Sequence, residues 1–143
     1  MEITANASQT IATNGNVLFT DTVVPGNCSI FHREDSGLVT LRALPNGQCR
    51  ARFRVYFNGN IKADTSATVS SATAISLAIA INGEAINSTI MTATVEDTTA
   101  TYNVAASTFI DVPTGCCQTV SVKSTSTIAI DALNSNLIVE RVA

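Results

Sequence analysis

Apolar and polar residues alternate along most of this sequence, a pattern typical of half-buried β-strands. The clearest example is CRARFRVYF at 49–57, where apolar side chains or a cysteine alternate with three arginines and a tyrosine. Side chains two residues apart share one face of a strand, so this segment has an apolar and a cationic face. Similar patterns predict strands at 17–24, 28–34, 38–44, 49–57, 75–81, 85–96, 102–112, 117–124, 126–132 and 136–143.

Turn-forming residues separate most of these segments. PGN at 25–27, DSG at 35–37, PNG at 45–47 and NGE at 82–84 each stand between two apolar runs. FNGN at 57–60, together with the Thr/Ser/Ala-rich residues 63–73, predicts a loop. No segment carries the 3.6-residue apolar stripe of a surface helix. Short strands with regular turns predict an all-β sandwich or barrel.

The length and composition predict a single domain that makes subunit contacts. The 143 residues suffice for one domain over 1–143, with 1–16 as an N-terminal arm or linker. Charged residues make up 13% of the chain, about half of the roughly 25% in an average soluble domain. So few charges cover the surface poorly, and part of the apolar excess is therefore expected between subunits.

Charge and hydropathy exclude some classes of partner. The net charge is −3, whereas nucleic-acid binding needs a basic face. The longest apolar run, AISLAIAI at 74–81, is too short to span a membrane, and the N-terminus lacks the features of a signal peptide. We therefore expect no nucleic acid, no membrane insertion and assembly inside a cell, including as part of a virus particle.

The order of several segments resembles a known superfamily. The stretches that carry the resemblance are SGLVTL, CRARFRVYFNGN, SLAIAINGEAI, FIDVPTGCCQTVSVKS and the C-terminal NLIVERVA. Together they are similar to the compact jelly roll of tumour necrosis factor-like and complement-type globular heads. Bacterial and phage members that end in a LIVERVA-like strand are the most similar.

The resemblance implies a ten-stranded, trimer-forming sandwich with its chain ends near one base. Phage and bacterial relatives serve as fibre tips, particle decorations or surface adhesins. This chain departs from the animal members because aromatic residues are only 5% of it and no Gly-X-Y stalk is present. No receptor or calcium site is therefore carried over from them.

The cysteines and the single histidine are the first candidates for chemistry. Cys28, His32 and Cys49 could contribute to a metal site, but the chain has no CxxC or HxxxH pair, and cysteine is commonly a small buried apolar residue. A disulfide could join Cys28 to Cys49, or one of these to Cys116 or Cys117, and the sequence does not choose among the connectivities. Cytoplasmic assembly would keep the thiols reduced.

Cys116 and Cys117 are adjacent, so in a strand they would point to opposite faces. This predicts a core thiol at Cys116, in line with Val120 and Val122, and a near-surface or interface thiol at Cys117. No acid–base pair or catalytic triad accompanies His32. We expect no enzyme activity and no cofactor.

Arg50, Arg52 and Arg54 form a cationic row that could bind an anion or an acidic glycan. Like charges on one strand repel, which instead favours pairing with carboxylates such as Glu140 or Asp111, within the chain or across a subunit contact. Both faces of NLIVERVA and of ISLAIAI at 75–81 are apolar, which suggests burial on both sides. The residues predicted for a subunit interface are Arg50, Arg52, Arg54, Leu137, Ile138, Val139 and Glu140.

These observations favour a homotrimeric jelly-roll module with a structural or adhesive role. We expect a phage virion surface protein, such as a capsid decoration, head fibre or fibre tip, assembled in the bacterial cytoplasm. It would contact other virion proteins or a host-surface ligand, with loops 58–73 and 96–101 as the candidate contacts. The alternative is an adhesin of a bacterial cell surface or spore coat that binds carbohydrate or protein.

Overall fold

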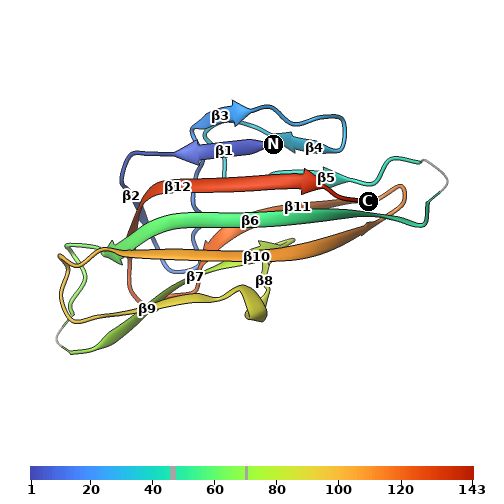
Figure 1. Ribbon diagram of the computed structural model, residues 1–143. Helices are drawn as coiled ribbons and strands as arrows, with labels where there is room; N and C mark the ends of the chain where they lie inside the picture. Colours follow the sequence, from blue (N-terminus) through green and yellow to red (C-terminus); the bar gives the residue numbers. More distant parts are fainter. Residues whose placement is uncertain (46–47, 70) are drawn as a thin grey trace.

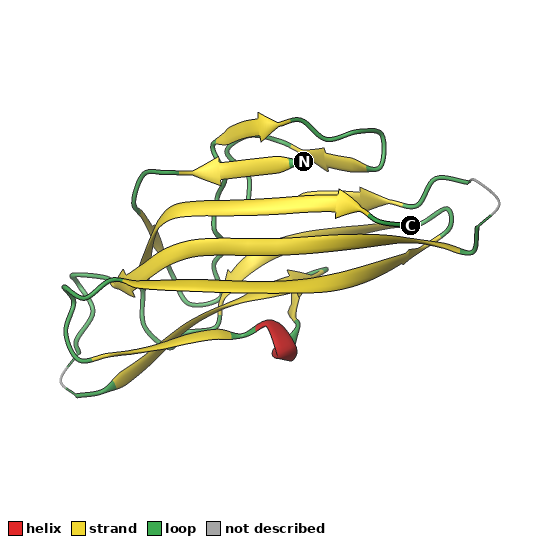
Figure 2. Ribbon diagram, in the orientation of Figure 1, coloured by secondary structure: helices red, strands yellow, loops and turns green. Residues whose placement is uncertain are grey.

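The computed structural model describes residues 1–45, 48–69 and 71–143, which form a sandwich of two six-stranded sheets (Figures 1 and 2). All the strand pairs are antiparallel. The first sheet has the order β10 (Tyr102–Pro113), β6 (Arg50–Ala63), β12 (Ile130–Arg141), β1 (Glu2–Ala5) and β3 (Asp21–Val24), and β2 (Gln9–Ile11) also pairs with β12. The second has the order β4 (Ile30–His32), β5 (Val39–Arg42), β11 (Cys117–Ser124), β7 (Thr73–Ile81) and β8 (Glu84–Ala85), and β9 (Met91–Val95) also pairs with β7. A short 3-10 helix, η1 (Asn87–Thr89), precedes β9. The prediction of an all-β jelly-roll sandwich is confirmed.

The core lies between the two sheets and follows the predicted alternation of β6. Phe53, Val55 and Phe57 of that strand are fully buried. The opposite sheet contributes buried side chains from β5, β7 and β11, including Leu77 and Ile79. Burying each such side chain contributes roughly 1.5–3 kcal/mol, so this interior is the main source of stability.

The loop predicted to start at residue 58 is wrong in its first part. β6 continues through Asn58, Gly59 and Asn60 to Ala63, and the loop that follows begins at Asp64. Gly59 is buried, and a Cβ built on it would lie 2.9 Å from Cζ of Phe57 and 3.3 Å from Oγ of Ser135. The glycine is therefore needed for close packing inside a strand rather than for a turn.

The predicted N-terminal arm is also wrong. Residues 2–5 form β1, which lies between β12 and β3, and residues 9–11 form β2. Ile3, Ala5 and Ile11 are buried in the core. The N-terminal ammonium group also donates a 2.7 Å hydrogen bond to the Val139 carbonyl. Residues 1–16 thus belong to the domain.

Other element boundaries differ from the predictions. The segments 17–24 and 28–34 shorten to β3 and β4, whereas 126–132 and 136–143 largely merge into β12. The register of β12 with β6 shifts between Leu133 and Asn136, where Asn134 has a φ of 50°. The turn predicted at 45–47 lies largely outside the described residues. No helix in the described ranges has the length and hydropathy to cross a membrane.

Candidate functional site

The arginine row lies on the outer face of the first sheet. β6 alternates, so Arg50, Arg52 and Arg54 point away from the core while Phe53 and Val55 point into it. The register pairs Arg52 with Asp111 of β10 and Arg54 with Glu140 of β12. Carboxylates therefore flank the row on both neighbouring strands.

These side chains form three ion pairs. Arg52 donates from Nε to Oδ1 of Asp111 at 2.7 Å and from Nη2 to Oδ2 at 2.9 Å. Nε of Arg50 lies 3.3 Å from the same carboxylate, and Nη1 of Arg54 lies 3.6 Å from Oε1 of Glu140. The predicted pairing of the arginines with Asp111 and Glu140 is confirmed.

The Asp111 carboxylate, shared by Arg50 and Arg52, is held in its ionised form by these two arginines. The hydrogen bond from Arg52, with the charges of Arg50 and Arg52, lowers the pKa of Asp111 below its ordinary value. The same hydrogen bond and the charge of Asp111 raise the pKa of Arg52. Both groups stay ionised at neutral pH, and three guanidinium groups face two carboxylates.

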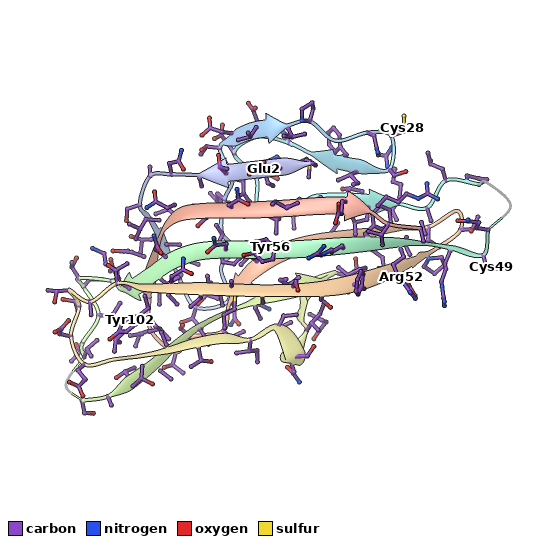
Figure 3. All side chains as sticks on the ribbon, in the orientation of Figure 1. Glu2, Cys28, Cys49, Arg52, Tyr56 and Tyr102 are labelled. Atoms are coloured by element: carbon purple, nitrogen blue, oxygen red, sulfur yellow. The ribbon has the colours of Figure 1, made fainter. Side chains whose placement is uncertain are left out.

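A shallow hollow of about 250 Å³ lies near the centre of the sheet face, lined by Arg54, Tyr56, Ile138 and Glu140. Tyr56 is paired with Ile138 across β6 and β12, and Figure 3 shows Tyr56 near the middle of the sheet. Phe109 of β10 is paired with Arg54 and has 63% of its surface exposed. Tyr56, Phe109 and Ile138, with the Arg54–Glu140 ion pair, are named the Tyr56 face below.

Amide side chains cover the sheet beyond the Tyr56 face. Asn103 Nδ2 donates to Oδ1 of Asn58 at 2.9 Å and to Oδ1 of Asn60 at 3.1 Å. Asn136 Nδ2 donates to Oε1 of Glu2 at 2.6 Å. The outer face thus changes from arginines through an apolar centre to amides.

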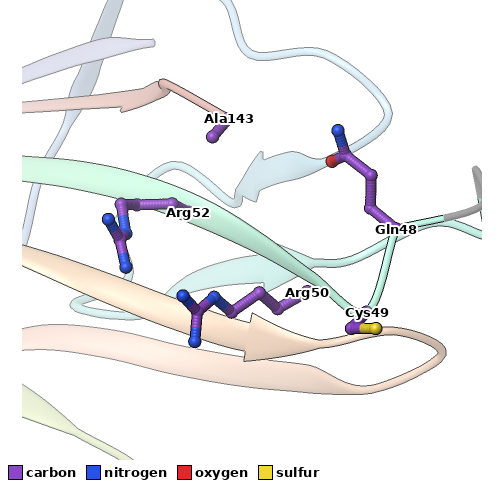
Figure 4. A pocket seen from close by; sticks show the side chains of 5 residues that line it. All are labelled: Gln48, Cys49, Arg50, Arg52 and Ala143. Atoms are coloured by element: carbon purple, nitrogen blue, oxygen red, sulfur yellow. The ribbon is translucent and has the colours of Figure 1, made fainter.

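A second hollow, of about 380 Å³, lies at the arginine end of the sheet, where Gln48, Cys49, Arg50, Arg52 and Ala143 line it (Figure 4). The Arg52 amide donates to the Ala143 carbonyl at 3.2 Å, and the Val142 amide donates to the Arg52 carbonyl at 2.9 Å. These backbone bonds hold the last residues against β6, so Ala143 forms one wall of the hollow.

Two residues of the predicted interface are not available for a subunit contact. Leu137 and Val139 are fully buried in the chain's own core, because their positions in β12 point inward. Ile138 is half-buried and Glu140 is exposed on the outer face. In β7, Ala78 and Ala80 are fully buried by the single chain, so the apolar pattern of that strand does not require a subunit contact.

The cysteines do not match their predicted positions. All four are free and exposed, including Cys116, which was expected in the core. Cys116 ends a tight turn, closed by its amide donating to the Pro113 carbonyl at 3.0 Å with Gly115 at a φ of 79°, so it precedes β11. Within the described ranges, no three His, Cys, Asp or Glu side chains are placed to hold a metal ion. Cys28, His32 and Cys49 therefore do not form a ligand set, and His32 Nε2 instead lies 3.0 Å from the Ser36 carbonyl.

The candidate contact loops lie at the end of the sandwich remote from the C-terminus (Figure 1). In the loop after β9, Asp97 Oδ1 accepts from the Thr99 amide at 2.9 Å and from the Ala100 amide at 3.1 Å. The Thr99 hydroxyl also donates to Asp97 Oδ1, at 2.8 Å. The donors from Thr99 and Ala100 together lower the pKa of Asp97. This loop is therefore held by its own hydrogen bonds.

Phe109 is the surface residue that sequence reasoning missed. In TYNVAASTFIDVP it alternates with the buried Ile110 and has the same parity as Asp111, which was expected beside the arginines. Residues two positions apart in a strand share a face, so the spacing of Phe109 and Asp111 could have placed Phe109 beside the arginines. A large aromatic side chain on the arginine-bearing face indicates a contact surface.

No protein-family model matches this sequence, and no curated protein sequence does. Among solved structures, the globular domain of zebrafish complement 1qA protein aligns over 96% of this chain and 93% of its own, with 9% identity and a TM-score of 0.57. Rabbit GITRL aligns over 80% of this chain and 77% of its own, with 12% identity and a TM-score of 0.41. A CBM35 module from Cellvibrio japonicus Abf62 aligns over 100% of this chain and 97% of its own, with 10% identity and a TM-score of 0.32. The first of these similarities establishes the complement-type globular-head fold for this chain.

Proposed function

We propose that this chain is a non-enzymatic binding module that assembles into a homotrimer through the Tyr56 face. The observation that carries the proposal is the exposed apolar centre of the first sheet, between the arginines and the amides, where Phe109 keeps 63% of its surface accessible. Exposed aromatic side chains grouped with apolar neighbours mark interaction surfaces. The superfamily resemblance supports a trimer as the assembly.

The charges of the Tyr56 face suit a contact between copies. Arg54 already lies 3.6 Å from Glu140, so the pair can be covered without leaving one ion uncompensated. The amides of Asn58, Asn103 and Asn136 offer donors and acceptors for the polar rim of such an interface. Arg50 and Arg52 lie toward the end of the strand, outside the proposed contact.

The assembly would display the loops at the end opposite the C-terminus. Residues 64–69, 71–72 and 96–101 are assigned this role, in place of the wider 58–73 expected from sequence, in which residue 70 lies outside the described residues. Three copies held together raise the avidity of weak individual contacts. Rigid multivalent presentation is thus the mechanism proposed for binding or adhesion.

We further propose that the trimer is displayed on the surface of a phage virion after assembly in the bacterial cytoplasm, in contact with other virion proteins or a host-surface ligand. The similarity to phage and bacterial jelly rolls that end in a LIVERVA-like strand supports this location. Immunodetection on purified particles, compared with intact host cells, tests it. Detection only on cells or spores would favour the alternative of a bacterial adhesin.

The mass of the assembly in native solution tests the trimer. At micromolar concentration we expect a mass three times that of the chain, and Phe109→Ser should shift it toward the monomer. Phe31→Ser is the matched control, because Phe31 is also strongly exposed, at 57%, but lies in β4 of the other sheet. A monomeric wild-type chain, or equal effects of both variants, would contradict the proposed interface.

A further inference from the structure

Four cysteines from distant parts of the sequence lie in segments that backbone hydrogen bonds connect, toward the end of the sandwich where β6 and β11 begin. Cys117 is paired with Arg42, whose amide donates to the Ser29 carbonyl at 2.8 Å, next to Cys28. The Thr114 amide, in the turn before Cys116, donates to the Cys49 carbonyl at 3.1 Å. Figure 3 shows Cys49 at the right-hand tip of the molecule and Cys28 apart from it, at the upper edge. Cys28, Cys49, Cys116 and Cys117 are named the thiol end below.

The exposure of all four thiols is unusual. Cysteine is among the most frequently buried residue types, yet each of these is free and exposed. None of them contributes to the core that holds the sandwich together. Packing therefore does not explain their presence at this end.

Arginines lie beside two of the four thiols, Cys49 and Cys117. Arg42 lies opposite Cys117 and makes no ion pair with any described residue, whereas Arg50 follows Cys49 directly. Figure 4 shows Cys49 beside the hollow that Arg50 and Arg52 also line. Asp111 is already paired with Arg50 and Arg52, so arginines outnumber carboxylates among these groups although the chain carries a net charge of −3. Reactive cysteines are typically found in such electropositive, accessible surroundings.

We propose that the thiol end is a thiol–disulfide exchange site for low-molecular-weight disulfides that carry carboxylates, of the glutathione disulfide class. The hollow of about 380 Å³ beside Cys49 has the size of a small-ligand site. The guanidinium groups of Arg50 and Arg42 would pair with the carboxylates of the incoming disulfide. This proposal is independent of the homotrimer.

The exchange is a displacement at sulfur. A cysteine of the thiol end loses its proton to water, and its thiolate attacks one sulfur of the incoming disulfide. A new S–S bond forms, the old one breaks, and the departing thiolate takes the electron pair and is then protonated. The incoming disulfide is the oxidant, so no other redox partner is needed.

The geometry favours mixed disulfides over bridges between the closest thiols within the chain. Cys116 and Cys117 are adjacent, and their Cα atoms lie about 3.8 Å apart, less than the roughly 4.4 Å that a disulfide requires. Cys28 lies in the turn before β4, which pairs with one edge of β5, and Cys117 begins β11, which pairs with the other edge. β5 therefore separates the segments that carry these two cysteines, and all four thiols are free.

The rates of modification by oppositely charged disulfides test the proposal. Glutathione disulfide and the cationic cystamine would each be mixed with the reduced chain, and adducts followed by intact mass and peptide mapping. Each rate is divided by the rate at which the same reagent modifies an uncharged cysteine peptide. This ratio corrects for the intrinsic reactivity of the reagent. We expect a corrected preference for glutathione disulfide of about tenfold at low ionic strength, which shrinks severalfold at about 1 M salt.

Variants locate the effect. Arg50→Gln should reduce the preference at Cys49, and Arg42→Gln should reduce it at Cys117. Arg33→Gln, in the turn between β4 and β5, is the charge-matched control and should leave both unchanged. Equal corrected rates for the two reagents, a preference for cystamine, or an intrachain disulfide in place of the adduct would overturn the proposal.

Discussion

Arg52 and Asp111 face each other across β6 and β10 and are joined by two hydrogen bonds, of 2.7 and 2.9 Å. The guanidinium fork matches both carboxylate oxygens, which fixes the direction of both side chains. Arg50 lies 3.3 Å from the same carboxylate. One aspartate therefore screens two arginines of the row from each other.

Replacing that carboxylate should destabilise the chain modestly. Asp111→Asn leaves Arg50 and Arg52 with an amide in place of a charged acceptor, so we expect the melting temperature at neutral pH to fall by about 1–3 °C. The pKa of Asp111 is lowered in the folded chain, so its stabilisation is lost as the pH falls through the folded-state pKa. Thermal melts of both proteins between about pH 2 and pH 7 should therefore converge in acid. A difference that does not change with pH would contradict this account of the ion pair.

Gly59 should tolerate no side chain. A Cβ would lie 2.9 Å from Cζ of Phe57, so Gly59→Ala forces either the buried ring or the strand to move. We expect a loss of about 1–3 kcal/mol in the free energy of unfolding, measured by urea denaturation. Asn58→Ala, at the neighbouring outward position, should cost less because it creates no overlap. Equal costs for the two variants would contradict the packing role of Gly59.

This glycine also explains where the strand prediction stopped. Asn58-Gly59-Asn60 has the composition of a turn, but it continues β6 because it pairs with β10 and β12, and the ring of Phe57 packs over Gly59. β1 was missed because EITA is short, and its stability comes from pairing with β12 and β3. The pairing with β12 joins residues more than a hundred positions apart in sequence, such as Glu2 and Ile138, so no local pattern contains it.

The site could be predicted where alternation and charge acted together. Three arginines on one face required carboxylates, and Asp111 and Glu140 lie on the strands beside them. In NLIVERVA, apolar residues occupy both faces, Leu137 and Val139 on one and Ile138 and Val142 on the other, so alternation did not reveal which face points inward. The register of β12 with β6 decides this, because Leu137 is paired with the buried Phe57 and Ile138 with Tyr56.

Asp131 should make stability fall as the pH rises. It is largely buried beside Asp64 and accepts a 3.0 Å hydrogen bond from Thr10, and burial, with the Asp64 carboxyl, raises its pKa above 3.8. Lys62, also nearby, opposes this shift. Between 3.8 and the raised value, the folded chain binds more protons than the unfolded chain, so increasing pH lowers the free energy of unfolding. Asp131→Asn removes this cost, and its melting temperature relative to wild type should rise by about 1–4 °C from acid to neutral pH.

Asp64→Asn is the matched control with the opposite sign. The hydrogen bond from the Ser66 hydroxyl is the main cause of the lowered pKa of Asp64. Its contribution to stability is therefore present at neutral pH and lost in acid, so this variant should be less stable than wild type mainly at neutral pH. Parallel pH profiles for the two variants would refute the assignment of opposite shifts.

The buried hydroxyl of Thr89 should matter more than its methyl group. Oγ1 accepts from the Ile79 amide at 3.0 Å and donates to the Ile86 carbonyl at 2.7 Å, which connects η1 to β7. Thr89 is only 2% exposed, so Thr89→Val leaves the Ile79 amide without this acceptor and without water. We expect a loss of about 1–3 kcal/mol in urea denaturation. Thr89→Ser keeps the hydroxyl and removes one methyl group, for a cost of about 0.8 kcal/mol. If Thr89→Ser were the more damaging change, packing rather than the hydrogen bond would hold η1 against β7.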